Sequence, residues 1–256
     1  MMSSLRITLA QMDIFWENKA ANFDYLKLVV GNVCAHEKPD IVVLPEMFST
    51  GFSMHSHELA ESFHGETISQ LTAFAATFEV AIVGSFICRE GEHYYNRAFF
   101  ITPQESYYYN KHHLFRMGGE AQSFSPGEER VIVAYKQWQI MLLVCYDLRF
   151  PVWSRNRGCE YDLCIYVANW PASRIQVWDA LLLARALENQ TYVCGVNRVG
   201  IDGNDISYNG HSKLIDPRGK VLLQLDKNKA CTEVVTIDKE PLLRFREKFP
   251  VWMDAD

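Results

Sequence analysis

"IMLLVCYDLRFPVWSRN" (residues 140–156) changes in character abruptly at its cysteine. Residues 140–144 are all apolar, and a continuous apolar run of this length is typical of a strand that is buried on both faces. Charged side chains, Asp147 and Arg149, follow almost at once, so the chain leaves the core directly after Cys145. Cys145 is therefore either a small core side chain, as most cysteines in apolar surroundings are, or a nucleophile at the edge of a sheet.

The segments on either side of this strand alternate between strand-like and helix-like patterns. Hydrophobic spacing predicts helices at residues 18–37, 65–79 and 176–190. A hairpin is expected around "DPRG" (216–219), and other apolar or β-branched runs predict strands at residues 5–11, 40–46, 80–88, 96–103, 105–111, 130–135, 138–145, 161–169, 192–200 and 230–238. No linker or repeat interrupts this alternation. We therefore predict a single α/β domain over residues 1–256, in which helices cover the faces of the sheets.

Three of the predicted strands end on residues that carry chemistry: "VVLPE" on Glu46, "YYYNK" on Lys111 and "MLLVC" on Cys145. Ligands of α/β proteins gather where strands end and loops begin. A cysteine nucleophile needs a base, a fixed position and donors for the oxyanion. Glu46 fits the base, and Lys111 would pair with it, favour the thiolate and stabilise an oxyanion. The backbone N–H of Tyr146 would be the second oxyanion donor.

Each of these residues also has an ordinary explanation when it is taken alone. Glu46 can cap a helix, Lys111 can be solvated and Cys145 can fill the core. The chain has seven cysteines, an odd number without any C-x-x-C pair, and most of them lie in apolar runs. This pattern favours free thiols in a reducing compartment, with packing as their usual role. Only the combination of three strand ends favours a catalytic site.

Composition excludes several classes of function. The 256 residues carry a net charge of −6, which argues against a nucleic-acid surface. No apolar run approaches the roughly 20 residues that span a bilayer, and the N-terminus lacks a signal-peptide pattern, so we expect a cytoplasmic protein without a membrane partner. No H-E-x-x-H, Walker or G-x-G-x-x-G motif is present. We therefore expect neither a metal nor another cofactor.

The segments around the three strand ends resemble the signature segments of a known family. They are "LPEMFSTGF" at Glu46, "NKHHLF" at Lys111 and "LLVCYDLRFPVWSRN" at Cys145. In order, spacing and context they are similar to those of the nitrilase superfamily, the carbon–nitrogen hydrolases. The residues of these segments most resemble the bacterial ω-amidase branch. The similarity continues through "YVANWPASR", "ARALENQTYV" and "NRVGIDGNDISYNGHSKLIDPRG", so it covers nearly the whole chain.

This resemblance implies a fold and a set of roles. The fold would be a four-layer αββα sandwich that forms homodimers or higher homo-oligomers, with a C-terminal tail (about residues 240–256) contacting a partner subunit. Glu46 would be the general base, Lys111 the electrostatic stabiliser and Cys145 the nucleophile that forms a thioester. A second glutamate often precedes an "SPG"-like turn in this family, and Glu120 in "GGEAQSFSPG" would fill that role by positioning Lys111 or the substrate amide.

The same branch hydrolyses the terminal amide of 2-oxo dicarboxylate monoamides, such as α-ketoglutaramate. The far carboxylate of such a substrate needs a cation, and the fork of an arginine suits it. Residues that flank the active segments are the candidates for the substrate site: Arg116, Arg149 and Arg174 for the carboxylate, and Phe115 and Trp170 for the walls. Arg149 is equally a possible structural partner of Asp147 or of another strand-end carboxylate, and either aromatic ring could belong to the core.

Two other functions compete with the ω-amidase hypothesis. The first is another amidase of the same superfamily, such as an N-carbamoyl-amino-acid or aliphatic amide hydrolase. The second is a catalytically silent binding or redox protein, which the combination of Glu46, Lys111 and Cys145 argues against. Arginines beside the active segments favour an anionic amide over a neutral one.

Overall fold

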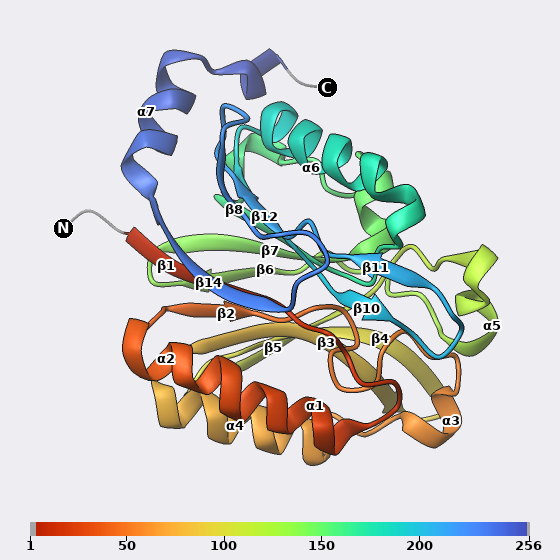
Figure 1. Ribbon diagram of the computed structural model, residues 1–256. Coiled ribbons are helices and arrows are strands. Elements are labelled where there is room, and N and C mark those ends of the chain that lie inside the picture. The colour runs from red at the N-terminus through yellow and green to blue at the C-terminus, as the bar shows by residue number, and fades with distance from the viewer. Residues whose placement is uncertain (1–3, 255–256) are drawn as a thin grey trace.

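The computed structural model describes residues 4–254 and contains two six-stranded sheets that pack face to face (Figure 1). Helices cover the outer side of each sheet, with α1, α2 and α4 on one side and α6 on the other. The predicted four-layer αββα sandwich is confirmed. No helix within residues 4–254 is long and apolar enough to cross a membrane.

The first sheet has the strand order β14-β1-β2-β3-β4-β5. Its strands are β1 (Ser4–Gln11), β2 (Ile41–Val43), β3 (Ala81–Glu90), β4 (His93–Ile101), β5 (Ser106–Asn110) and β14 (Cys231–Asp238). The strands β1, β2 and β3 are parallel, and the outer pairs are antiparallel. Parallel strands end at the same edge of a sheet, so the loop after β2 lies at the same edge as the carboxyl ends of β1 and β3.

The second sheet has the order β13-β12-β9-β8-β7-β6, again with three parallel strands at its centre. Its strands are β6 (Ile132–Tyr135), β7 (Trp138–Val144), β8 (Leu163–Ala168), β9 (Tyr192–Asn197), β12 (Lys213–Ile215) and β13 (Val221–Gln224). A separate two-stranded sheet pairs β10 (Val199–Ile201) with β11 (Ser207–Asn209). The central position of β7 and β8 places the loops that follow them at the middle of one edge of the sandwich.

Four segments supply the outer helical layers: α1 (Lys19–Tyr25), α2 (Gly31–Glu37), α4 (Glu66–Phe78) and α6 (Ile175–Asn189). Two short helices lie in the connections, α3 (Ser56–Leu59) and α5 (Glu120–Ser123), and α7 (Lys239–Lys248) follows the last strand. Turns of 3-10 helix occur at Arg116–Gly118, Cys145–Arg149, Arg157–Cys159, Ala172–Arg174 and Val251–Asp254. The turn at Cys145–Arg149 follows β7 without any intervening residue.

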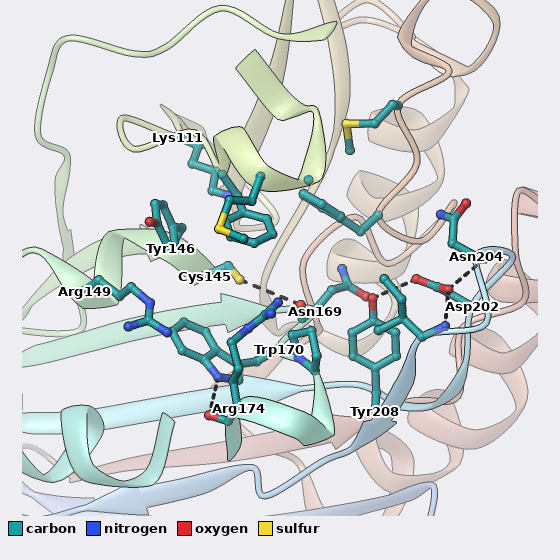
Figure 2. Close-up of a pocket in the computed structure, with 17 residues that line it drawn as sticks. Lys111, Cys145, Tyr146, Arg149, Asn169, Trp170, Arg174, Asp202, Asn204 and Tyr208 are labelled. Carbon is teal, nitrogen blue, oxygen red and sulfur yellow. Dashed lines mark hydrogen bonds between the residues drawn. The ribbon is translucent and has the colours of Figure 1, made fainter. Parts of the chain in front are cut away.

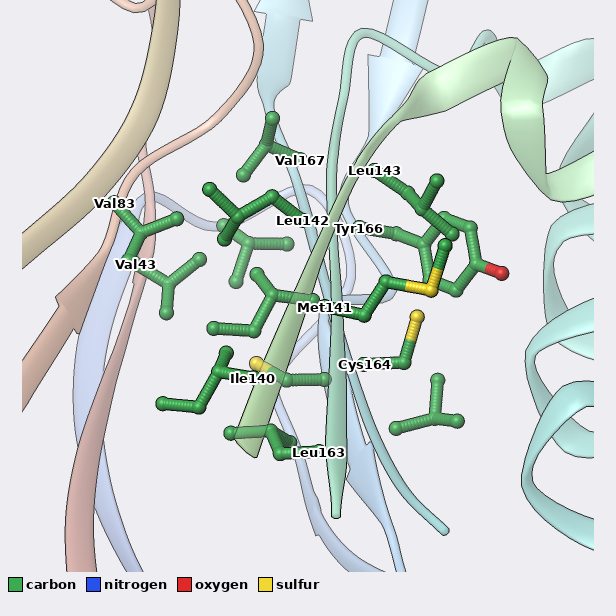
Figure 3. Packing of buried hydrophobic residues seen from close by; sticks show 14 of the residues in the cluster. Val43, Val83, Ile140, Met141, Leu142, Leu143, Leu163, Cys164, Tyr166 and Val167 are labelled. Atoms are coloured by element: carbon green, nitrogen blue, oxygen red, sulfur yellow. The ribbon is translucent and has the colours of Figure 1, made fainter. Parts of the chain in front are cut away.

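The apolar run that ends at Cys145 is buried on both faces, as expected. Figure 3 shows Ile140 and Leu142 pointing toward Val43 of the first sheet, whereas Met141 points the opposite way, where Tyr166 also lies. One side of β7 therefore packs against the other sheet, and the other side faces the helical layer. Complete burial of an apolar side chain of this size stabilises a fold by about 1.5–3 kcal/mol. This packing fixes the strand that carries the candidate nucleophile.

The structure corrects the predicted boundaries at several places. The helix expected at 18–37 contains a π-helical turn at Leu26–Val30 between α1 and α2. The strand expected at 192–200 divides into β9 and β10, because the chain leaves the second sheet after Asn197 and Val199 N donates to the carbonyl of Met12, directly after β1. The short strand β11 and the helix α7 were not predicted.

A buried arginine helps to attach the C-terminal segment to its own chain. Arg246 of α7 donates to the carbonyl of Tyr161 (2.7 Å) and to Asp162 Oδ1 (3.1 Å). Beyond α7 the structure describes the chain as far as residue 254, and residues 255–256 of the predicted tail lie outside the described part. The contact of this tail with a partner subunit stays a prediction.

Candidate active site

Cys145 occupies an unusual backbone conformation directly after β7. Its φ angle is +43°, in the left-handed region that residues with a side chain rarely adopt. Such strain costs about 1–3 kcal/mol and persists only where the surroundings enforce it. The turn leaves Cys145 half-buried at a cleft, with Sγ 3.9 Å from the backbone carbonyl of Asn169. The change from strand to turn seen in the sequence is therefore a sharp bend at Cys145, which places the thiol at the cleft.

A buried carboxylate, Asp147, holds this bend in place. Its Oδ2 accepts hydrogen bonds from the Tyr109 hydroxyl (2.8 Å) and from Val144 N (3.0 Å). Its Oδ1 lies 2.9 Å from both the backbone N and the ring Nδ1 of His113, so Nδ1 carries the hydrogen. Asp147 thus joins the residue before Cys145 to the loop that follows β5, which carries Lys111.

Lys111, Glu46 and Glu120 form a fully buried cluster beside Cys145. Lys111 Nζ lies 2.9 Å from Glu46 Oε1, and 2.8 and 2.9 Å from the two carboxylate oxygens of Glu120. All three side chains are completely excluded from solvent. The loop after β2, the end of β5 and the start of α5 supply one member each. The structure therefore brings together the four residues that the sequence singled out as catalytic.

Two asparagines complete this cluster. Asn169, directly after β8, donates from its backbone N to Glu46 Oε2 (2.8 Å) and from Nδ2 to the Glu46 carbonyl (2.6 Å). Asn96 of β4 donates to one oxygen of each glutamate, Glu46 and Glu120. Phe115 N donates to the second oxygen of Glu120 (2.6 Å). Each carboxylate is thus fixed by several donors.

Sequence reasoning missed both asparagines. Asn169 carries a signal that could have been used, because it ends the apolar run "LCIYVA" as Cys145 ends its own strand. Asn96 carries none, because it lies inside a strand among aromatic residues and only the pairing of β4 with β3 and β5 places it below Glu46.

The electrostatics of the cluster determine the resting state of the thiol. Burial raises the pKa of Cys145 well above its ordinary value, and the carboxylate of Glu46 adds to this rise. Lys111 favours the thiolate, as expected from the sequence, but the other causes outweigh it. Burial alone would lower the pKa of Lys111, whereas Glu120 and Glu46 raise it above its ordinary value. The site therefore pairs a lysine ammonium with a cysteine thiol.

The pKa of Glu120 is shifted by the same surroundings. Burial raises the pKa of its carboxyl group above the ordinary value, although Lys111 acts in the opposite direction. Glu46 contributes a further rise, because two carboxylates that share one ammonium repel each other. One lysine thus stabilises two acidic groups in a site without access to bulk water.

A cleft of about 300 Å³ opens above Cys145 (Figure 2). In this view Lys111, Tyr146 and Arg149 lie on one side of Cys145, and Asn169, Tyr208 and Asp202 lie on the other. The predicted substrate residues that line the cleft are Phe115, Arg149, Trp170 and Arg174. Arg116 does not line it: this side chain is exposed on the 3-10 turn, and we remove it from the substrate site.

The two cleft arginines form no ion pair with any of the residues 4–254. Arg149 lies over the Trp170 ring, with Cζ 5.3 Å from the ring centroid, and Arg174 lies over Phe115 at the same distance. The alternative in which Arg149 pairs with Asp147 is wrong, because the hydrogen bonds of that carboxylate go to Tyr109, Val144 and His113. The cleft therefore contains two cations that stack on its walls and have no acidic partner there.

Two histidines near the site stack on aromatic rings. His112 stacks on Trp153 and His113 stacks on Phe150, with ring centroids 3.7 and 3.8 Å apart. Within residues 4–254, no group of three histidine, cysteine, aspartate or glutamate side chains has a geometry that could hold a metal ion. Of the described side chains, the buried cluster around Lys111 provides the groups for acid–base and nucleophilic chemistry.

A four-layer sandwich that presents a thiol, an ammonium and two carboxylates at one cleft has the architecture of a nitrilase-type hydrolase. The family model of the carbon-nitrogen hydrolases matches residues 6–246, and the chain belongs to this family. It is therefore an enzyme that hydrolyses carbon–nitrogen bonds other than peptide bonds, and not a catalytically silent thiol protein.

Known proteins resemble the chain over its full length. It is 42% identical to the omega-amidase YafV of Escherichia coli (strain K12), and the match covers 100% of this chain and 98% of that protein. It is 32% identical to a 2-oxoglutaramate amidase of Bacillus subtilis, over 97% and 96% of the two chains. The crystal structure of XC1258, a CN-hydrolase superfamily protein of Xanthomonas campestris, superposes with a TM-score of 0.94 at 39% identity, covering 100% and 98%. That structure carries an arsenic adduct in its active site.

Proposed function

We propose that the protein is an ω-amidase that hydrolyses the terminal amide of 2-oxo dicarboxylate monoamides, of the α-ketoglutaramate type, to the 2-oxo acid and ammonia. The observation that carries this proposal is the pair of unpaired arginines, Arg149 and Arg174, in the cleft that contains Cys145. Two cations without acidic partners favour an anionic substrate, and the guanidinium fork matches a carboxylate. The relatives named above as amidases of this type support the same substrate class.

The reaction would begin with attack of the Cys145 sulfur on the amide carbon. Glu46 accepts the thiol proton as the carbon–sulfur bond forms, because the resting group is a thiol. Lys111 and the backbone N–H of Tyr146 would stabilise the oxyanion of the tetrahedral intermediate. Glu46 then gives the proton to the leaving nitrogen, the carbon–nitrogen bond breaks, ammonia departs and a thioester remains.

Hydrolysis of the thioester would use the same groups. Glu46 removes a proton from a water molecule, the water oxygen attacks the thioester carbon, and the carbon–sulfur bond breaks. The proton returns to the sulfur of Cys145, and the carboxylic acid product leaves. Glu120, which holds Lys111 through both of its oxygens, would keep the ammonium aimed at the oxyanion. No metal takes part in these steps.

The proposal is tested by ammonia release from a panel of amides. The panel contains α-ketoglutaramate, α-ketosuccinamate, glutamine, simple aliphatic amides and N-carbamoyl amino acids. We expect the two 2-oxo acid amides to be the best substrates, and Cys145→Ala to be inactive on all of them with its fold retained. A preference for neutral amides or carbamoyl amino acids would replace the ω-amidase assignment by another amidase of the family. Full activity of Cys145→Ala would contradict the mechanism itself.

A further inference from the structure

Asn96 closes a ring of hydrogen bonds beneath the proposed base. Its Nδ2 donates to Glu46 Oε1 (2.7 Å) and to Glu120 Oε1 (3.1 Å). The same two oxygens lie 2.9 and 2.8 Å from Lys111 Nζ. Two nitrogen donors and two carboxylate oxygens therefore alternate around a four-membered ring, in which each carboxylate contacts both donors. The mechanism proposed above assigns a role to every member of this ring except Asn96.

The orientation of this amide is fixed by its other end. Ser85 Oγ donates to Asn96 Oδ1 (2.9 Å), and it can do so because it accepts a hydrogen bond from Met47 N (2.8 Å). The oxygen of the amide is thereby held away from the carboxylates, and both hydrogens of Nδ2 point toward them. Asn96 is completely buried, so water cannot replace these donors.

The charges around the ring explain why a neutral donor is needed. One ammonium, Lys111, faces two carboxyl groups, Glu46 from the loop after β2 and Glu120 from α5. The thiol of Cys145 is the next titratable group, and the Tyr208 hydroxyl from β11 interacts more weakly with Glu46. A second lysine would cancel the negative charge that a base requires. An amide supplies hydrogen bonds to both carboxylates without changing the net charge.

We propose that Asn96 is a positioning residue that keeps Glu46 and Glu120 ionised and fixed around Lys111, so that Glu46 can accept the proton of Cys145. This inference rests on the proposed roles of Glu46 and Cys145. Loss of a hydrogen-bond donor favours the protonated form of a carboxylate. Without Asn96 the base would therefore be protonated over a wider range of pH, and fewer molecules would be competent for attack.

The test compares Asn96→Ala with Asn96→Asp over the pH range of activity. The alanine variant lacks the donor, so we expect the acid limb of its kcat/KM profile to move to higher pH by about one unit. The aspartate variant keeps the volume but can donate only while its new carboxyl is protonated. Its rate should therefore fall as the pH rises through the titration of that carboxyl, which is the opposite slope.

A residue that only fills space would give a different result. Both variants would then show the wild-type profile at a lower level, with the aspartate variant closer to wild type because it keeps the volume. Parallel profiles of this kind would overturn the proposal. The matched control is Asn156, another buried asparagine, whose Nδ2 donates to the carbonyls of Tyr161 and Asn189 away from the cluster. We expect Asn156→Ala and Asn156→Asp to lower the melting temperature and leave the pH profile unchanged.

Two further measurements keep the test decisive. Ser85→Ala leaves Asn96 in place but removes the bond that orients it, so it should move the acid limb in the same direction as Asn96→Ala by a smaller amount. If the Asn96 variants do not fold, the pH profile of Ser85→Ala is the test instead. The rate of Cys145 alkylation by iodoacetamide, followed by mass spectrometry, reports transfer of the thiol proton without any substrate. If wild type releases no ammonia from any amide, the proposed function fails; if it does, and the Asn96 variants alkylate and titrate like wild type, only this inference fails.

Discussion

Cys145 adopts its left-handed backbone conformation because its neighbours enforce it. The apolar strand before Cys145 is packed between two layers, and the carboxylate of Asp147 accepts a hydrogen bond from the backbone N–H of Val144. Burial and Glu46 both raise the pKa of this thiol, which favours its protonated form. Cys145 thus combines a strained backbone with a thiol that is held in a buried environment.

The sequence could locate the three candidate residues because each lies at the end of a predicted strand. Glu46, Lys111 and Cys145 follow β2, β5 and β7 by at most three residues, and their flanking segments form recognisable motifs. The motif approach fails for residues whose position depends on strand pairing, as Asn96 shows. Motifs also do not predict which way a side chain points. Arg116 directly follows the cleft residue Phe115 in the sequence, yet its side chain points to solvent because a 3-10 turn begins at Arg116.

Substrate charge is the first prediction at this scale. A charge-assisted contact between an arginine and a carboxylate contributes about 1.5–3 kcal/mol, which corresponds to roughly tenfold to a hundredfold or more in kcat/KM. We expect Arg149→Gln or Arg174→Gln to lose this amount on α-ketoglutaramate and little on a neutral amide of the same length. The measurement is kcat/KM for both amides.

The control for this prediction is Arg116→Gln. Arg116 is exposed outside the cleft, so its removal should change neither rate constant. An arginine variant that loses the anionic and the neutral amide equally would be structural, and the substrate carboxylate would have to bind elsewhere.

At the scale of elements, the site is assembled from loops that follow strands of both sheets. The loops after β2 and β5 come from the first sheet, and those after β7 and β8 come from the second. Alternation of strands and helices in the sequence predicted these elements, and the site was expected where strands end and loops begin. It did not predict α7 or the division between β9 and β10, because both depend on contacts with distant parts of the chain.

Asp147 links two of these elements, since one carboxylate binds both the turn after β7 and the loop after β5. We expect Asp147→Asn to slow amide hydrolysis by about tenfold to a hundredfold and to lower the free energy of unfolding by about 3 kcal/mol. The reason is that an amide offers one acceptor oxygen, whereas the carboxylate accepts bonds on both oxygens. Steady-state kinetics and urea denaturation measure the two effects.

Asp162 provides a matched comparison for this variant. It is also a buried carboxylate, and it binds Gln139 N, Lys239 and Arg246 at the opposite end of β8. Asp162→Asn should destabilise the fold to a similar degree while kcat stays near the wild-type value. If both variants lose activity in proportion to stability, Asp147 has no special connection with the nucleophile.

At the scale of the whole molecule, the sandwich buries several thiols that take no part in the proposed chemistry. Burial raises the pKa of Cys34 to about 12, of Cys88 to about 11 and of Cys164 to about 12. A cysteine of an unfolded chain has a pKa of about 8.5. The folded state therefore retains protons that the unfolded state loses as the pH rises.

These raised pKa values predict a loss of stability in alkaline solution. The contribution of each thiol is fully present below about pH 8.5 and decreases as the pH rises toward 11 or 12, by about 1.4 kcal/mol per pH unit and thiol. We expect the free energy of unfolding in urea to be clearly lower at pH 10 than at pH 7.5. Cys88→Ala should be less stable than wild type at pH 7.5 but should show a shallower decline. Equal stability of wild type at the two pH values would contradict the prediction.

The last prediction concerns assembly, and it rests on the C-terminal segment. Arg246 anchors α7 to its own subunit, but several apolar side chains beyond that anchor are exposed, among them Phe249 (58%) and Met253 (68%). Exposed apolar groups that follow a firmly attached helix favour contact with a second copy of the chain, as the family resemblance implied. We therefore expect a homodimer or higher homo-oligomer by size-exclusion chromatography with light scattering.

Truncation after Lys248 tests the role of this segment, because it removes the exposed residues and keeps the contacts of Arg246 with Asp162. The truncated chain should fold, with a melting temperature close to that of wild type at low protein concentration, and it should dissociate at concentrations at which wild type remains associated. Since an oligomer gains stability by mass action, only the wild-type melting temperature should rise with protein concentration. A truncated chain with unchanged mass in solution would show that the subunits meet through another surface, and a monomeric wild type would contradict the prediction altogether.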